Sequence, residues 1–255
     1  MLLFSLPVDV ESPSWVFLAC LYHYIRNLHH YIRNLYSYIF GNQLLRFKSL
    51  ACRIVAVLNT LLEAINISKE GSFQRILGNY AIDVSSVSDA RLFTGVTFSG
   101  NINDALSDPL RNTSVLKTPF DDTVVNSSKA TTIRFPRTLF NESSLVTLGP
   151  QTIILALYKE TKFFRVVPKP PKSLLNSFVV AARIRGLSVS NLTHPVEITF
   201  VDLKRGDKNS SLCSFWNFER GNWSQDGCSL QKILPDGRIV CNCNHLTNFA
   251  VLMVS

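Results

Sequence analysis

The chain has 255 residues, of which 46% are apolar and 17% are charged. These values exclude disorder and coiled coil as descriptions of the whole chain. Lysine and arginine exceed the acidic residues by 26 − 18 = +8. The cations are spread along the chain, without the blocks typical of nucleic-acid binding, so we expect no nucleic-acid partner.

The first 42 residues carry a short duplication whose role is unassigned. The sequence at 23–28 recurs seven residues later at 30–35, and two copies are too few for a coiled coil. A short, aromatic-rich helix is the simplest interpretation. The start of the chain lacks the basic region of a signal peptide, so an extracellular protein with this sequence would have its true N-terminus upstream. No segment has the roughly 20 apolar residues of a membrane-spanning helix.

Residues 43–80 are predicted to be helical. Apolar residues at 44–67 recur with spacings of three, four and seven, the pattern of an amphipathic helix. A second short helix is predicted at 73–80, after Gly71, and the two form a candidate helical hairpin.

From residue 81 onward the sequence predicts a β-sandwich, because short β-branched and aromatic runs alternate with turn residues. The candidate strands are 91–98, 131–135, 152–158, 178–184, 196–203 and 248–254. Two of these runs are apolar throughout, at 152–158 and 249–253, as in strands that are buried on both faces.

A basic surface between two of these strands has two interpretations. It contains Lys159, Lys162, Arg165, Lys169, Lys172, Arg183 and Arg185. The favoured interpretation is a solvated loop around three prolines, and the alternative is a binding site for a glycosaminoglycan.

Cysteine and sequon patterns indicate the compartment. Two cysteines, Cys20 and Cys52, lie far upstream, whereas four lie in the last 43 residues. Chance predicts about three Asn-x-Ser/Thr sequences, but seven occur, at Asn66, Asn112, Asn126, Asn141, Asn191, Asn209 and Asn222. This excess favours a glycosylated, oxidised, extracellular protein.

The four C-terminal cysteines, Cys213, Cys228, Cys241 and Cys243, together with His245 invite a zinc interpretation, but gaps of 14 and 12 residues fit structural zinc sites poorly. Two disulfides fit better, and no cofactor is expected. Cys241 and Cys243 point to one face of a strand, and a bond between them is strained. Cys213 and Cys228 are therefore the partners, in either of two connectivities. Trp216 and Trp223 add apolar area to this small unit.

His245, Leu246 and Thr247 form a tripeptide with a specific chemical capability. The His can act as a base for the Thr hydroxyl, which lies beside the preceding carbonyl carbon. Attack gives an N→O acyl shift and an ester that water hydrolyses. A planar peptide resists this reaction, so the fold must supply strain and proximity. On chemistry alone, a His-Leu-Thr sequence is common, and the favoured interpretation is the plain entry to a strand.

The segment 213–253 resembles the GPCR proteolysis site (GPS) of adhesion G protein-coupled receptors. The shared pattern is Cys-x-x-Trp, a second Trp, Gly-Cys and then Cys-x-Cys-Asn-His-Leu-Thr-Asn-Phe-Ala-Val-Leu-Met. Polycystin-1-type proteins carry a related site. A weaker resemblance over 91–203 is to the family's GAIN domain, in which a helical subdomain A precedes a β-sandwich, subdomain B. The resemblance thus implies a mainly β fold with a short helical remnant at 43–80, subdomain B at 81–255 and the GPS motif at 209–255.

The resemblance also implies roles for individual residues. Cleavage would fall between Leu246 and Thr247, with Thr247 as nucleophile and His245 as base, once and in cis rather than with turnover. Disulfides would join Cys213 to Cys241 and Cys228 to Cys243. The strand from Thr247, with Phe249, Leu252 and Met253, would stay buried after cleavage and act as the tethered agonist of the seven-helix region.

Two departures accompany this resemblance. The chain stops a few residues before a first membrane helix would begin, and the helical part is short. We therefore expect a fragment or soluble form of a receptor at the extracellular face of the plasma membrane, or a secreted protein. Its partners would be its own C-terminal fragment, the seven-helix region, a G protein through that region, and an extracellular protein or glycosaminoglycan ligand. The alternatives are an uncleaved adhesive sandwich and a polycystin-1-like region.

Overall fold

A computed structural model describes residues 55, 59–60, 62–65, 67, 71–77, 80–102, 113–119, 130–141, 149–159, 161, 164, 173–201 and 210–254. All of them belong to the compact unit Ser49–Ser255. The predicted segment 1–42, its repeat, Cys20 and Cys52 lie outside the described residues.

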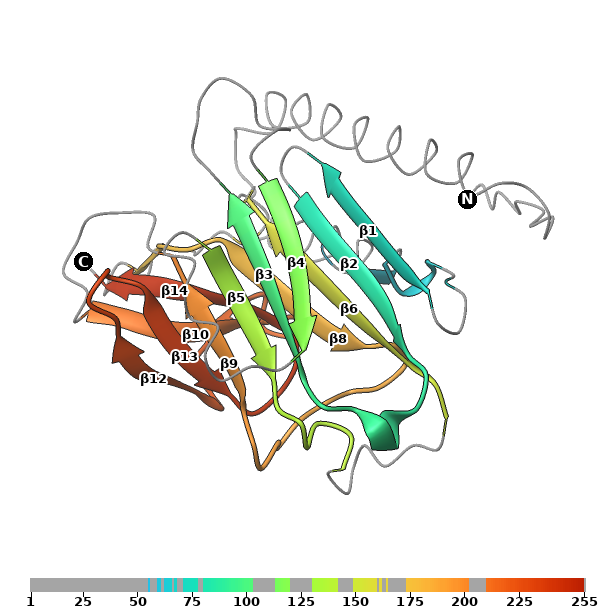
Figure 1. Cartoon of the computed structure of the whole chain (residues 1–255). Helices are drawn as coiled ribbons and strands as arrows, with labels where there is room; N and C mark the ends of the chain where they lie inside the picture. The colour runs from blue at the N-terminus through green and yellow to red at the C-terminus, as the bar shows by residue number, and fades with distance from the viewer. Residues whose placement is uncertain are drawn as a thin grey trace, which may run out of the picture. The chain divides into compact units, whose positions relative to one another are not determined.

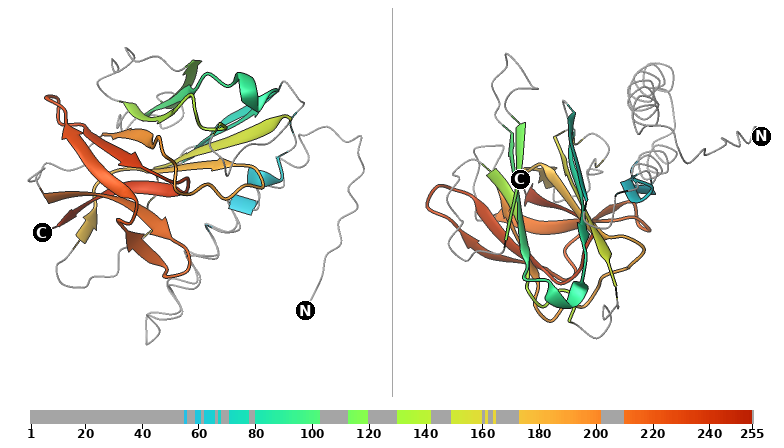
Figure 2. Two further views of the ribbon diagram at one scale, coloured as in Figure 1. Left: turned by 90° about the horizontal axis from the view of Figure 1, so that it is seen from below. Right: turned by 45° about the vertical axis from the view of Figure 1, so that its right-hand side comes forward.

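The described residues form two antiparallel sheets (Figure 1). Sheet A has the order β1 (Ser72–Leu77), β2 (Tyr80–Val87), β6 (Gln151–Tyr158), β8 (Val179–Ile184), β14 (Asn248–Val254), β10 (Ser211–Asn217) and β11 (Asn222–Ser224), and β7 (Ser173–Leu175) also pairs with β14. Sheet B has the order β12 (Cys228–Ile233), β13 (Ile239–Cys243), β9 (Val196–Phe200), β5 (Ala130–Phe135), β3 (Val96–Ile102) and β4 (Thr113–Pro119). The two sheets lie face to face as a β-sandwich (Figure 2).

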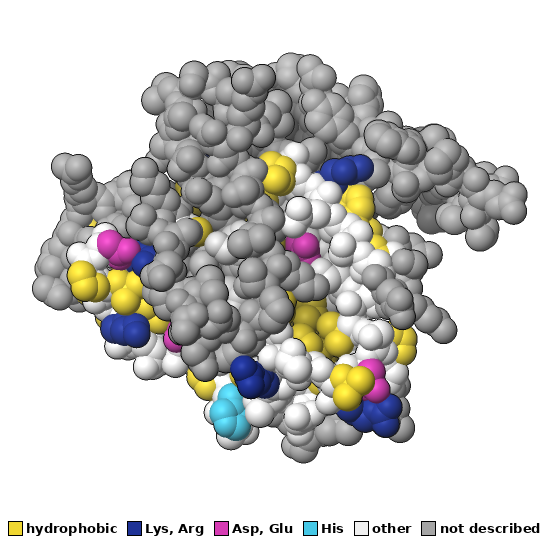
Figure 3. Space-filling view, viewed as in Figure 1, with side chains coloured by type: hydrophobic (Ala, Val, Ile, Leu, Met, Phe, Trp, Pro, Cys, Tyr) yellow, Lys and Arg dark blue, Asp and Glu magenta, His cyan; other side chains and the backbone are white. Residues whose placement is uncertain are grey.

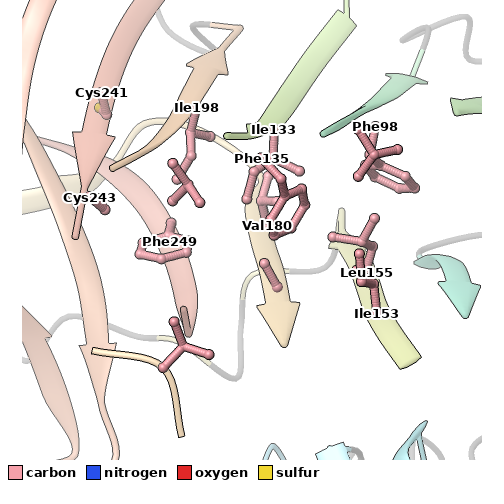
Figure 4. Close-up of a cluster of buried hydrophobic side chains, with 14 of the residues drawn as sticks. Phe98, Ile133, Phe135, Ile153, Leu155, Val180, Ile198, Cys241, Cys243 and Phe249 are labelled. Atoms are coloured by element: carbon pink, nitrogen blue, oxygen red, sulfur yellow. The ribbon is translucent and has the colours of Figure 1, made fainter. Parts of the chain in front are cut away.

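The two faces of sheet A bury two separate hydrophobic clusters. The inner cluster fills the space between the sheets, with side chains from both, such as Phe98, Leu155 and Ile198 (Figure 4). The outer cluster covers the opposite face of sheet A and includes Val55 and Leu62. Along β6, successive residues alternate between these clusters, which explains why its sequence is apolar throughout.

The mainly β fold is confirmed, and five of the six candidate strands correspond to β5, β6, β8, β9 and β14. β9 ends at Phe200, before the predicted end, and residues 202–203 are outside the description. β1, β2, β4, β7 and β10 to β13 were not predicted as strands. β10 to β13 carry turn residues and polar side chains that hide their alternation.

The predicted second helix at 73–80 is wrong. Residues 72–77 form β1, which pairs with β2 in an antiparallel hairpin. Phe73 packs against the outer cluster and Ile76 against the inner one. This segment is therefore a strand with apolar contacts on both faces.

The predicted strand at 91–98 begins too early. Ala90–Leu92 form a 3-10 turn, in which the Asp89 side chain accepts a hydrogen bond from the Arg91 N–H at 2.9 Å. Gly95 then has a φ of 88°, and strand β3 starts only at Val96. The capping Asp89 and the left-handed Gly95 thus keep the residues between them out of the strand, although several of those residues favour β structure.

The predicted helix at 44–67 lies mostly outside the described residues. Within it, residues 55, 59–60 and 62–63 are helical, so the helical remnant is not confirmed as a subdomain. Across the described ranges, we find no helix with the length and apolar character needed to span a bilayer.

Candidate functional site

The loop from Asn244 to Thr247 carries the predicted site, and it joins the two sheets. It follows β13 of sheet B and leads into β14 of sheet A, a strand that lies between β8 and β10. The chain crosses from one layer of the sandwich to the other at this point. A crossing of this kind holds both ends of the loop in rigid structure, which is a condition for placing reacting groups.

Two disulfides fix the strand before the loop. Cys213 of β10 bonds Cys241 across the two sheets, with Cα atoms 5.8 Å apart. Cys228 of β12 bonds its partner in the ladder, Cys243, with Cα atoms 4.2 Å apart. This is the pairing that the resemblance implies. The four sulfur atoms that the zinc interpretation requires are therefore used in disulfides.

Backbone hydrogen bonds brace the loop on both sides of the Leu246–Thr247 peptide. The Leu246 N–H donates to the Val189 carbonyl at 3.1 Å, and the Thr247 carbonyl accepts from the Ala182 N–H at 2.9 Å. Upstream, the Asn244 carbonyl accepts from Leu192 N–H at 2.7 Å. Leu246 and Thr247 are partly buried, and Leu246 packs against the inner cluster.

His245 lies in an aromatic setting. Its ring packs edge-on to Phe215, with centroids 4.4 Å apart, and lies 5.5 Å from the ring of Phe249. Burial lowers the pKa of His245 below its ordinary value of 6.5. The imidazole is therefore neutral at physiological pH, as a general base must be.

The two ring nitrogens of His245 have different surroundings. Nδ1 lies 3.1 Å from Oδ1 of Asn244, an oxygen that can only accept a hydrogen bond. This contact favours the tautomer with the proton on Nδ1. Nε2 is buried and has no hydrogen-bond partner in the described part of the chain. The lone pair of Nε2 is therefore available.

Gly227 makes room for this arrangement. Its φ is 75°, and its carbonyl accepts a hydrogen bond from the Asn244 N–H at 2.9 Å. A Cβ at this position would collide with Oδ1 of Asn244 and approach Nδ1 of His245 to 3.2 Å. Glycine is thus required twice, by its backbone conformation and by the side chain lying over it. The motif contains this Gly, but only the fold reveals what it contacts.

The two predicted core tryptophans lie on the outer face of sheet A, away from the disulfides. Trp216, which is 2% exposed, packs edge-on to Phe164 at 5.7 Å and to Trp223 at 5.4 Å. The indole N–H of Trp223 donates to the Phe164 carbonyl at 3.0 Å. Nothing in the sequence singled out Phe164, because it lies 52 residues from Trp216 along the chain.

In the strand after the loop, Phe249 and Leu252 are buried, whereas Met253, which was also expected in the core, is partly exposed. Phe249 lies among Cys243, Ile198 and Val180 in the inner cluster (Figure 4). Phe249 and the disulfide cysteines Cys241 and Cys243 belong to the same cluster, so the residues on both sides of the loop are packed in the core of the sandwich.

Of the seven sequons, three fall on described residues. Asn141 and Asn191 are exposed, and Asn222, in β11, is partly exposed. Asn66, Asn112, Asn126 and Asn209 lie outside the described ranges.

The predicted basic surface is described at Lys159, Arg183 and Arg185 only. Arg183 approaches Glu63 at 3.9 Å, and the Arg185 guanidinium donates to the Ile65 carbonyl. These two arginines hold residues of the 55–67 segment. On the face drawn in Figure 3, the described Lys and Arg side chains do not gather into one patch.

Comparisons with known proteins identify the family of this fold. A family model described as GPS, GAIN subdomain B, matches residues 94–255. Adhesion G-protein coupled receptor G6 of Danio rerio is 31% identical over 180 residues, which are 69% of this chain and 14% of that protein. Adhesion G protein-coupled receptor G3 of Mus musculus is 31% identical over 125 residues, 48% of this chain and 23% of that protein.

The chain therefore spans less than a quarter of the length of these relatives. Among solved structures, the full extracellular region of zebrafish Gpr126/Adgrg6 is similar, with a TM-score of 0.63 and 22% identity. The match covers 82% of this chain and 27% of that one. At this identity, the likeness supports the fold.

Proposed function

Since the chain belongs to the GPS/GAIN subdomain B family of adhesion G protein-coupled receptors, we propose that it cleaves its own backbone once, between Leu246 and Thr247. It then retains the new N-terminal strand from Thr247 inside the sandwich. In the intact receptor this region stands on the extracellular side, and the strand is shielded until it acts on the seven-helix region. A G protein is engaged only through that region.

One observation carries the proposal: His245, whose Nε2 is buried and without a hydrogen-bond partner among the described residues, lies two residues before Thr247 in a loop that backbone hydrogen bonds hold on both sides. Nε2 takes the hydroxyl proton while Oγ1 attacks the Leu246 carbonyl carbon. The C–N bond then breaks, and the proton passes to the Thr247 nitrogen. Water hydrolyses the resulting ester to the Leu246 carboxylate and the free Thr247 hydroxyl.

Asn244 and Gly227 support this step without reacting. The Oδ1 of Asn244 favours the proton on Nδ1, which leaves Nε2 as the base. Phe215 and Phe249 pack against the ring and limit its rotation. The proposal therefore needs no cofactor and describes a single turnover.

Intact mass spectrometry of the deglycosylated, denatured chain tests the proposal. We expect two species, residues 1–246 and 247–255, whose masses sum to the chain of 28.7 kDa plus one water. Electrophoresis is less suitable, because the smaller fragment has only nine residues. A single species at the full mass would instead favour the uncleaved adhesive sandwich.

Matched variants separate the chemistry from the fold. Thr247→Ala and His245→Ala should give the uncleaved mass only, whereas Thr247→Ser retains a hydroxyl nucleophile and should still cleave. Ser190→Ala serves as the control, because Ser190 is an exposed hydroxyl in the neighbouring loop and its loss should leave cleavage unchanged. Trapping by hydroxylamine would identify the ester intermediate.

A further inference from the structure

The strand β14 has an interrupted neighbour on one of its two sides. On one side, β10 pairs with it continuously from Phe249 to Met253. On the other side, β8 pairs with Asn248 and Phe249, and β7 pairs from Leu252 onward. Residues 176–178, between β7 and β8, are not in a strand. The backbone ladder is therefore broken opposite the middle of β14.

A serine hydroxyl fills this break. The Oγ of Ser177 accepts a hydrogen bond from the Val251 N–H at 2.8 Å and donates to the Phe178 carbonyl at 2.8 Å. Beside it, the Asn176 N–H donates to the Val251 carbonyl at 2.8 Å. Ser177 and Val251 are both fully buried, so water cannot replace the hydroxyl.

We propose that this hydroxyl, the Ser177 bridge, sets how firmly the sandwich retains the strand that begins at Thr247. The role in retention rests on the proposed function, since it concerns the strand after cleavage. The bridge itself exists in the uncleaved chain. Without Oγ, the Val251 N–H is buried and unpaired, which disfavours the bound strand. In the released strand the same N–H binds water, so the change acts on the bound state alone.

Two other polar side chains next to β14 do not serve this purpose. The Nδ2 of Asn176 reaches Met253 Sδ at 4.0 Å, a contact to a weak acceptor near the strand end. Ser214 lies on β10 and is also buried, but its hydroxyl donates to Leu212 of its own strand at 3.3 Å. Ser214→Ala is therefore a matched control, because it removes a buried hydroxyl beside β14 without removing a bond to β14.

The bridge is tested first in the uncleaved Thr247→Ala chain, by hydrogen exchange of the Val251 amide followed by NMR. Ser177→Ala should speed this exchange about tenfold, equivalent to about 1.4 kcal/mol, and Ser214→Ala should leave it unchanged. Unchanged exchange in Ser177→Ala would overturn the proposal. This measurement does not depend on cleavage.

Retention is tested next in the chain that carries Thr247. After cleavage, release of the peptide 247–255 is followed by size exclusion and mass spectrometry in urea below the unfolding transition. Ser177→Ala should release it about tenfold faster, and Ser214→Ala at the unaltered rate. Equal rates in a cleaved protein would overturn the retention proposal. A single uncleaved mass would defeat the proposed function instead, while the exchange result would still decide the bridge.

If Ser177→Ala does not fold, Ser177→Cys is measured in the same ways. A thiol is of similar shape but is a weaker acceptor, so its exchange and release should be faster than with Ser. Rates equal to those of the Ser chain would overturn the proposal.

Discussion

The two faces of β14 differ in the size of the side chains that they contribute to the two hydrophobic clusters. The inner face presents the large side chains Phe249 and Val251, which pack between the sheets near the disulfides. The outer face presents Ala250 and, two residues on, Leu252. The cluster that contains Ala250 also contains residues distant in the sequence, among them Phe164, Trp216 and described residues of the 55–67 segment. The strand thus contributes large side chains to the inner cluster, whereas at Ala250 the large side chains of the outer cluster come from distant parts of the chain. Truncation should harm the inner face, whereas enlargement should harm the outer face.

The largest expected effect is at the inner face. Phe249→Ala, in the uncleaved Thr247→Ala chain, should lower the free energy of unfolding by about 3–5 kcal/mol, because a fully buried ring leaves a cavity. Urea denaturation measures this loss. A loss below about 1 kcal/mol would mean that the core collapses around the gap and that the comparison of faces fails.

The disulfides come next. Replacing both cysteines of the Cys213–Cys241 pair by Ser should cost about 3–4 kcal/mol of unfolding free energy, and replacing both cysteines of the Cys228–Cys243 pair about 3 kcal/mol. The first pair closes the longer segment, with a separation of 28 residues against 15, and it joins the two sheets. Urea denaturation of the two double variants gives the order, and the reverse order would contradict this reason.

Enlargement of the outer face should have a smaller effect. Ala250→Leu places three extra carbon atoms beneath the aromatic residues, at a fully buried position, and should cost about 1–3 kcal/mol. Leu252→Met, a change that conserves volume at the same face, is the control. If both variants unfold at the same urea concentration, the outer face has room for a larger side chain. The expected difference between the two faces would then be wrong.

The pH dependence should report the burial of His245. Burial lowers its pKa in the folded chain, so the unfolded chain binds the proton first as the pH falls. The contribution of neutral His245 to the free energy of unfolding is therefore fully present above about pH 6.5. It declines as the pH falls from there and is lost below the lowered pKa of the folded chain. The cleavage rate should persist below pH 6.5 and fall only at the depressed pKa, as followed by mass spectrometry over time. His245→Asn should remove this part of the stability profile, and an unaltered profile would contradict the assignment.

The smallest effect should be at the edge of the outer cluster. Glu63→Gln should change the unfolding free energy by less than about 0.5 kcal/mol. Its carboxylate is 3.9 Å from Arg183 and its side chain is 41% exposed, so solvent screens the pair. Thermal unfolding measures the change. A loss above about 1 kcal/mol would mean that the 55–67 segment is held by this ion pair rather than by apolar packing.

Much of the site was predictable because its residues are close together in the chain. Cys241, Cys243, His245 and Thr247 span seven positions, and strand alternation alone places the two cysteines on one face, where the structure has them. The predicted helix at 73–80 is wrong because Phe73 and Ile76 lie on opposite faces of a strand, and each packs against a different cluster. Local pattern does not reveal how many faces of an element are covered.

By itself, the sequence determined the chemistry: which residues can attack, which can take a proton and which can be oxidised in pairs. Only the tertiary structure decided which groups those residues meet. Gly227 receives the Asn244 side chain, and Ser177 receives an N–H from a strand 74 residues away. Such contacts join distant segments, and a hydrogen bond between two buried groups depends on where the sheets bring them and not on their neighbours in the chain.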